Sequence, residues 1–112
     1  MTTTVQQQVL INARALIADP SHWTVGTLAT TARGHPVAWH AGTARKWCAQ
    51  GAIYRAAYDL IGDQKKAMRI GNDVMKSICP TRWLSGAGLA TINDSQGHAA
   101  VLAVFDKALQ AA

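Results

Sequence analysis

The 112-residue sequence contains no glutamate, so all six of its acidic residues are aspartates. Any carboxylate that acts as a general base would therefore have to be one of these six side chains. Lysine and arginine together number eleven, which gives the chain a formal net charge of +5. A basic excess of this size suits an acidic partner such as nucleic acid, and it also serves simple solubility.

Cysteine is scarce as well, because the chain holds only Cys48 and Cys79. Neither has another cysteine or a histidine at a spacing typical of metal ligands, so the sequence predicts neither a disulfide framework nor a zinc site. The histidines show no spacing at which two of them would share one helical face: His22, His35, His40 and His98. We expect no bound metal and no cofactor.

Long apolar runs are missing too. Polar residues interrupt every apolar segment well short of the roughly 20 residues that a membrane-spanning helix needs, and the N-terminus lacks the basic start and apolar run of a secretory signal. Hydrophobic residues still make up 49% of the chain, which is enough for a core at this length. We therefore expect one globular domain over residues 1–112, soluble and cytoplasmic, with no membrane association.

The apolar periodicity predicts mainly helical structure. Helices are expected over residues 4–18, 44–61, 64–78 and 97–110. Between the first two, segments 27–31 and 36–39 flank the turn-like ARGH, which predicts a small β-hairpin within residues 24–39, or an extended loop that resembles one. Two glycines weaken the helical tendency of residues 81–92, where we expect a short helical turn and a loop. The expected fold class is mainly α: a compact bundle of four or so helices with one small β-hairpin packed on it.

The helix expected over residues 44–61 is apolar on two faces, as is typical of a helix packed by neighbours on both sides. Cys48 falls on the narrow polar strip between these faces, in the second helical turn. A nucleophilic thiol would need a histidine as base and a polar residue to orient it, and His98 with Asn93 or Asp94 supplies those residue types. Free cysteines are usually small buried apolar residues. We expect Cys48 to pack, and a thiol-dependent hydrolase that uses Cys48 is one alternative.

Asn93 and Asp94 stand in a polar run just before the last expected helix. Such side chains accept hydrogen bonds from the backbone of the first helical turn, each worth about 1 kcal/mol. We expect the pair to cap this last helix, with a catalytic or ligand contact as the alternative.

The helix expected over residues 64–78 separates charged from apolar residues most clearly. Its four cations fall within an arc of roughly 100°: Lys65, Lys66, Arg69 and Lys76. Such a face could follow a line of phosphates, and Arg82 with Trp83 adds a charge and a stacking ring. A charge run on a helix is more often a solvated face, and no nucleic-acid-binding motif accompanies this one. Nucleic-acid or other anion binding through this face is a second alternative.

Four tryptophans in so short a chain suggest an interaction surface, because tryptophan is enriched at binding hot spots. Trp23, Trp39 and Trp83 are the interface candidates, although all four tryptophans could equally complete the core. We expect a noncatalytic binding or interaction module for a protein partner or a second copy of the chain.

Several short motifs follow one another along the chain: HWTVG, RGHPV, KWCAQGA, and INDS followed by VLAVFDKAL. In this order and spacing the sequence resembles a family of small bacterial and phage proteins defined only as a domain of unknown function. The matching positions are Trp23, Gly26, Gly34, Pro36, Val37, Cys48, Gly51, Ala52, Asn93, Asp94, Val101 and Ala108. Residues 62–90 do not follow the pattern, and the resemblance implies no particular activity.

Overall fold

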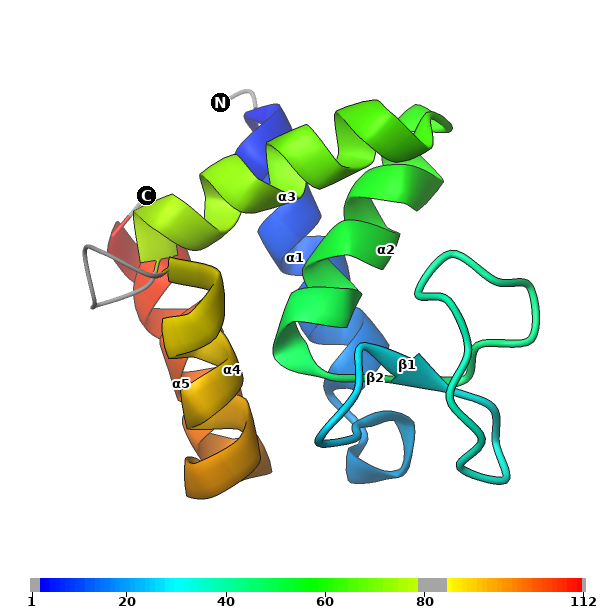
Figure 1. Cartoon of the computed structure of the whole chain (residues 1–112). Coiled ribbons are helices and arrows are strands. Elements are labelled where there is room, and N and C mark those ends of the chain that lie inside the picture. Colours follow the sequence, from blue (N-terminus) through cyan, green and yellow to red (C-terminus); the bar gives the residue numbers. More distant parts are fainter. Residues whose placement is uncertain (1–2, 79–84, 112) are drawn as a thin grey trace.

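A computed structural model describes residues 3–78 and 85–111 of the chain. These residues form α1 (Val5–Ile17), the 3₁₀ turn η1 (Pro20–His22), β1 (Ala29–Thr30), β2 (Lys46–Trp47), α2 (Ala49–Ile61), α3 (Gln64–Ile78), α4 (Ser85–Gln96) and α5 (His98–Ala111) (Figure 1). The expected fold class, mainly helical with one small antiparallel strand pair, is confirmed. None of the described helices has the length and apolar character required to cross a bilayer.

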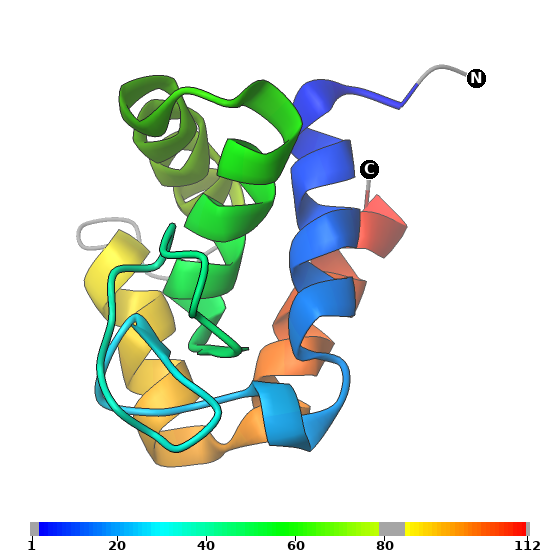
Figure 2. The same cartoon turned by 90° about the vertical axis from the view of Figure 1, so that its right-hand side faces the viewer.

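Helix α1 begins as predicted, at a threonine cap. The Thr4 hydroxyl accepts a hydrogen bond from the Gln7 amide, and the Gln7 side chain accepts one from the Thr4 amide. This reciprocal pair satisfies two backbone donors that a helix start leaves open. Along its length α1 buries Val9, Leu10, Ala13 and Ile17. It lies beside α5 (Figure 2), to which Arg14 is joined by an ion pair with Asp106.

Helix α2 packs against α1, α3 and α4. Most of its residues are buried, which agrees with the two apolar faces in the sequence. Its predicted start at residue 44 is wrong, because the helix begins at Ala49. Residues 46–47 pair instead with β1, and Cys48 has an extended backbone. Trp47 is buried but belongs to strand β2, so its position in the apolar pattern does not mark a helix face.

The pairing predicted between segments 27–31 and 36–39 is also corrected, because β1 has a different partner strand. Strand β1 pairs antiparallel with β2, whereas the second segment contributes a single bridge between Thr30 and Pro36. Two hydrogen bonds flank this bridge, from the Thr31 amide to the His35 carbonyl at 2.9 Å and from the Val37 amide to the Ala29 carbonyl at 3.1 Å.

Helix α3 spans the predicted residues 64–78 and lies across α2 (Figure 1). The two helices approach closely at Gly71, where an added Cβ would lie 2.5 Å from Cδ1 of Tyr54. The Tyr54 hydroxyl donates a hydrogen bond to Oδ1 of Asn72 at 2.6 Å. Tyr54 therefore fixes the position of α3 on α2.

The turn and loop expected for residues 81–92 are wrong from Ser85 onward, because this stretch belongs to helix α4. Leu89 and Asn93, one turn apart, are both fully buried. Their packing overrides the weak intrinsic helix propensity of the glycines in this segment. Gly97 then adopts a left-handed conformation (φ +93°), and α5 starts at His98.

Candidate functional site

Four residues that the sequence singled out meet at the N-terminus of α2. We call Trp23, Cys48, Asn93 and Asp94 the cap cluster. Cys48 is the N-cap residue of α2, and its Sγ accepts a hydrogen bond from the Gly51 amide at 3.3 Å. The prediction that Cys48 lies in the second helical turn is therefore wrong, because the helix starts five residues later than expected.

Asn93 is the centre of the cap cluster and is 0% exposed. Its Oδ1 accepts hydrogen bonds from the Ala49 amide at 2.9 Å and from Nε1 of Trp23 at 2.6 Å. Its Nδ2 donates to the Thr24 carbonyl and to Oδ1 of Asp94, both at 3.0 Å. A side-chain amide has two donor hydrogens and two acceptor lone pairs, so its hydrogen-bonding capacity is used in full.

The predicted capping role is correct in kind for Asn93 but assigned to the wrong helix, and it is wrong for Asp94, which binds no described helix start. Both residues lie in the last turns of α4, and Asn93 caps α2 rather than α5. Asp94 is exposed, and its Oδ1 accepts a hydrogen bond from the Gly26 amide at 3.1 Å. The pair thus ties the segment after η1 and the start of α2 to one end of α4.

Gly51 explains the spacing of cysteine and glycine in this cluster. Its amide reaches the Cys48 sulfur, and a Cβ at this position would lie only 2.0 Å from the Leu28 carbonyl oxygen. That same carbonyl accepts a hydrogen bond from the Cys48 amide at 3.2 Å. The glycine therefore lets α2 start directly against the backbone that precedes β1.

The environment of Cys48 does not activate its thiol. The side chain is 6% exposed, and burial raises its pKa above the ordinary value. The nearby Asp94 carboxylate acts in the same direction, while hydrogen bonds from the Gly51 and Gln50 amides oppose the rise. The reactive form of a cysteine is the thiolate, so a raised pKa leaves Cys48 a weak nucleophile near neutral pH.

His98 lies against Trp23 and the end of α1. Its Nε2 is 2.6 Å from the Ile17 carbonyl oxygen, and its ring centroid is 5.4 Å from that of Trp23. Because a carbonyl can only accept, Nε2 is the donor in this hydrogen bond. Within residues 3–78 and 85–111, no hydrogen bond joins His98 to Cys48. The structure therefore brings Cys48, Asn93 and Asp94 together and holds His98 in other contacts.

A surface pocket of about 240 Å³ opens beside the cap cluster. It is lined by Gly26, Thr27, Leu28, Cys48, Gln50, Ala90 and Asp94. The pocket was not predicted from the sequence, because its walls come from three separate segments. In the described part of the chain, no three histidine, cysteine or acidic side chains are grouped as metal ligands would be.

The predicted basic face forms on the outer side of α3. All four of its cations are exposed: Lys65, Lys66, Arg69 and Lys76. The opposite side of the helix buries Ala67, Gly71, Val74 and Met75. Neither ion pair found among the described residues involves these cations. Arg82 and Trp83, which were expected to extend this face, lie outside the described residues.

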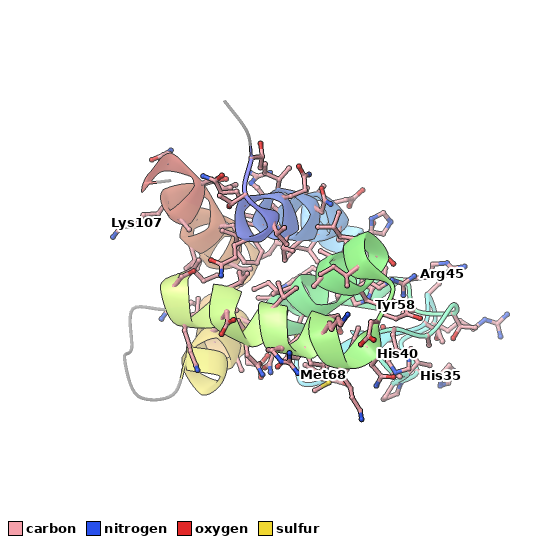
Figure 3. The ribbon with its side chains drawn as sticks, turned by 90° about the horizontal axis from the view of Figure 1, so that it is seen from above. His35, His40, Arg45, Tyr58, Met68 and Lys107 are labelled. Carbon is pink, nitrogen blue, oxygen red and sulfur yellow. The ribbon has the colours of Figure 1, made fainter. Side chains whose placement is uncertain are left out.

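A group of rings in tilted and edge-to-face contact, which we call the aromatic patch, covers one side of α2. It consists of Trp39, His40, Tyr54 and Tyr58, with ring centroids between 4.9 and 6.0 Å apart for each contacting pair. Trp39 is buried, whereas His40 and Tyr58 are half-buried. Figure 3 shows His40 and Tyr58 near each other, on the side of the molecule opposite Lys107.

Arg55 holds the aromatic patch in place. One of its terminal nitrogens donates to the Trp39 and Ala41 carbonyls at 3.3 and 2.9 Å, and its Nε pairs with Asp59. Its guanidinium also lies 5.4 Å from the ring centroid of Trp47. Of these residues the sequence had indicated only Trp39 as an interface candidate. The i, i+4 spacing of Tyr54 and Tyr58 was the signal that could have found the others.

The remaining interface candidate, Trp23, is half-buried and committed to the cap cluster through its Nε1–H. It lies beside His98, as described above. An interface role for Trp23 and Trp39 stays a prediction.

These features define a small, mainly helical domain. Cys48 and Asn93, which the sequence offered as possible catalytic residues, instead bind backbone amides in the first turn of α2. The chain belongs to the family of unknown function DUF6197, which matches residues 1–111. No curated protein and no solved structure gives a significant match.

Proposed function

We propose that the protein is a noncatalytic binding module that holds a protein partner through the aromatic patch. The observation that carries this proposal is the packing of four aromatic rings, two of them half-open to solvent, with Arg55 fixing the loop that supplies two of the rings. Tryptophan, tyrosine and arginine are the residue types most enriched at binding hot spots. Side chains already held in place lose little freedom on binding, which favours affinity.

The surroundings of the patch indicate what kind of partner it would hold. Tyr54 joins the aromatic patch to α3 through its hydrogen bond to Asn72. The exposed cations of α3 lie before and after Asn72 in this helix. A positive surface attracts an acidic one and repels a second copy of a chain that carries +5. The proposed partner is therefore a protein with an acidic surface, and self-association is the alternative that the test below separates.

The cap cluster supports a noncatalytic role. The Asn93 side-chain amide has no hydrogen-bonding capacity left. Burial raises the pKa of the Cys48 thiol and so disfavours the reactive thiolate. No specific observation favours the thiol-dependent hydrolase, and we do not propose it.

The partner test compares matched variants of the full chain. Tyr58→Ala and His40→Ala should each lose a partner that the wild type retains from an extract of its source cells. Leu60→Ala, an exposed truncation on the same helix, should retain it. Light scattering of the same samples should show a monomer; a dimer that is lost in Tyr58→Ala would assign the patch to self-association. Retention of every partner by Tyr58→Ala and His40→Ala would refute the proposal.

Nucleic-acid binding through α3 is a second candidate, favoured by its four exposed cations outside any described ion pair. Lys65 and Lys76 lie eleven residues apart, about 16 Å along a helix. Four phosphate contacts would weaken duplex binding about 100-fold between about 50 and 200 mM salt. The test is fluorescence anisotropy with labelled single- and double-stranded DNA and the variants Lys65→Glu and Lys107→Glu, of which only the first should reduce binding. Undetectable binding at low salt would remove this candidate.

We extend the proposal to a cytoplasmic setting and to a bacterial or phage source. The cytoplasm is supported by Cys48, which forms no disulfide within residues 3–78 and 85–111, since reducing compartments keep thiols unpaired. The source rests on the resemblance described in the sequence analysis. Fractionation of the source cells tests the first point.

A further inference from the structure

The pocket beside the cap cluster differs in charge from the rest of the molecule. Its seven lining residues include one aspartate and no lysine, arginine or histidine, in a chain that carries +5 overall. Asp94 is therefore a local negative site on a basic protein. A ligand that enters here meets a carboxylate rather than a cation.

The hydrogen-bonding groups around the pocket leave acceptors unused. Oδ1 of Asp94 is occupied by the Gly26 amide and by Nδ2 of Asn93, whereas Oδ2 has no donor among the described residues. Gln50 donates its Nε2 to the Tyr54 hydroxyl at 3.3 Å, which leaves its Oε1 without a described donor. One carboxylate oxygen and one amide oxygen, together with the Thr27 hydroxyl, which has no described partner, are thus available to accept hydrogen bonds from a ligand.

The donors at the start of α2 are already used. The Ala49 amide is bonded to Asn93, and the Gly51 amide to the Cys48 sulfur. A helix start with open amides would attract an anion, but these amides offer nothing to one. The pocket therefore suits a donor-rich cation.

We propose that this pocket binds a protonated primary amine on a short aliphatic stem, with the ammonium group donating to Oδ2 of Asp94 and Oε1 of Gln50. The apolar lining of Leu28 and Ala90 accommodates the stem. An ammonium fits better than a guanidinium, because paired binding of a guanidinium needs both carboxylate oxygens and Oδ1 is already saturated. The amine is either a free small molecule or the lysine side chain of a partner protein.

The test is a titration of the ¹⁵N-labelled full chain followed by amide chemical shifts. The probes are n-butylammonium chloride and n-butanol, its uncharged counterpart, at constant ionic strength. Butylammonium should give saturable shifts at Gly26, Gln50 and Asp94, and butanol should give none. Equal responses to the two probes, or no response to either, would overturn the proposal.

Two variants locate the binding. Asp94→Asn keeps an oxygen for the Gly26 amide but removes the charge, and should weaken binding at least about tenfold, as expected for a charge-assisted hydrogen bond. Asp73→Asn, which removes an exposed carboxylate of α3, should leave binding unchanged. Ala90→Leu fills the pocket and should abolish binding, so the test holds even if Asp94→Asn unfolds. Wild-type affinity in both pocket variants would refute the site.

The source of the amine is read from a third probe, the acetylated and amidated tripeptide Gly-Lys-Gly. Affinity well above that of butylammonium assigns the pocket to a partner's lysine, and equal affinity assigns it to a free amine. Both results support the amine site. Neither depends on the aromatic patch, so the two proposals fail separately.

Discussion

Replacement of Asn93 by alanine tests whether one amide of α4 closes the start of α2. The change removes four hydrogen bonds, two that the side chain accepts and two that it donates. Each such bond contributes about 1 kcal/mol net to stability. The Ala49 amide is fully buried and finds no replacement, whereas Trp23 and Thr24 are half-buried and can turn partly to water.

We therefore expect Asn93→Ala to lower the free energy of unfolding by about 3–4 kcal/mol. Small domains are stable by only about 5–15 kcal/mol, so this is a large fraction of the total. The corresponding fall in melting temperature is about 15 °C for a chain of this size. The measurement is urea unfolding followed by circular dichroism.

Two further variants make the result specific. Asn12→Ala removes a single local bond, to the Gln8 side chain, and should change stability by less than about 0.5 kcal/mol. Trp23→Phe keeps a ring but removes the donor to Asn93, so its cost should largely disappear in the Asn93→Ala background, giving a coupling of about 1 kcal/mol. A cost for Asn93→Ala no larger than that of Asn12→Ala would refute the reasoning.

Four other outcomes are expected. Gly51→Ala should cost at least about 2 kcal/mol in urea unfolding, since its new Cβ meets backbone, and Gly42→Ala, which meets nothing within 4 Å, should cost far less. Alkylation of Cys48 by iodoacetamide, read by peptide mapping, should be much slower in the native than in the unfolded protein at neutral pH. The pKa of Cys48 is raised in the folded state, so the folded protein binds more protons at alkaline pH than the unfolded protein. The free energy of unfolding should therefore fall as pH rises from the unfolded-state pKa of this thiol to its folded-state pKa. An unchanged free energy of unfolding over that range would contradict the raised pKa. A double-mutant cycle on Arg14 and Asp106, a partly exposed pair, should give a coupling below about 1 kcal/mol.

The helices that carry a complete local signal were predictable. α1 has its threonine cap and α3 has a clear separation of charged and apolar residues, and both lie where the sequence placed them. α4 lacks such a signal, since its helix depends on the burial of Leu89 and Asn93 against other elements. The start of α2 was missed for a related reason: strand pairing with β1 decides it, and that partner is remote in sequence.

The candidate site was predictable in its members but not in its arrangement. The sequence indicates Cys48 and Asn93 as candidates, but nothing in it predicts that the side-chain amide of Asn93 in α4 caps the start of α2. That contact joins residues 44 positions apart. The pocket depends on the same long-range packing, so it too became visible only in the fold.

The position of Asn93 has a consequence for synthesis of the protein. The most buried helix receives one of its caps from a residue translated 44 positions after its first turn. In a nascent chain that has emerged only as far as α3, the Ala49 amide of α2 and Nε1 of Trp23 both lack the Asn93 oxygen that accepts their hydrogen bonds. The first three helices cannot reach their final stability on the ribosome until α4 follows, and a product truncated before Asn93 would remain open at that end.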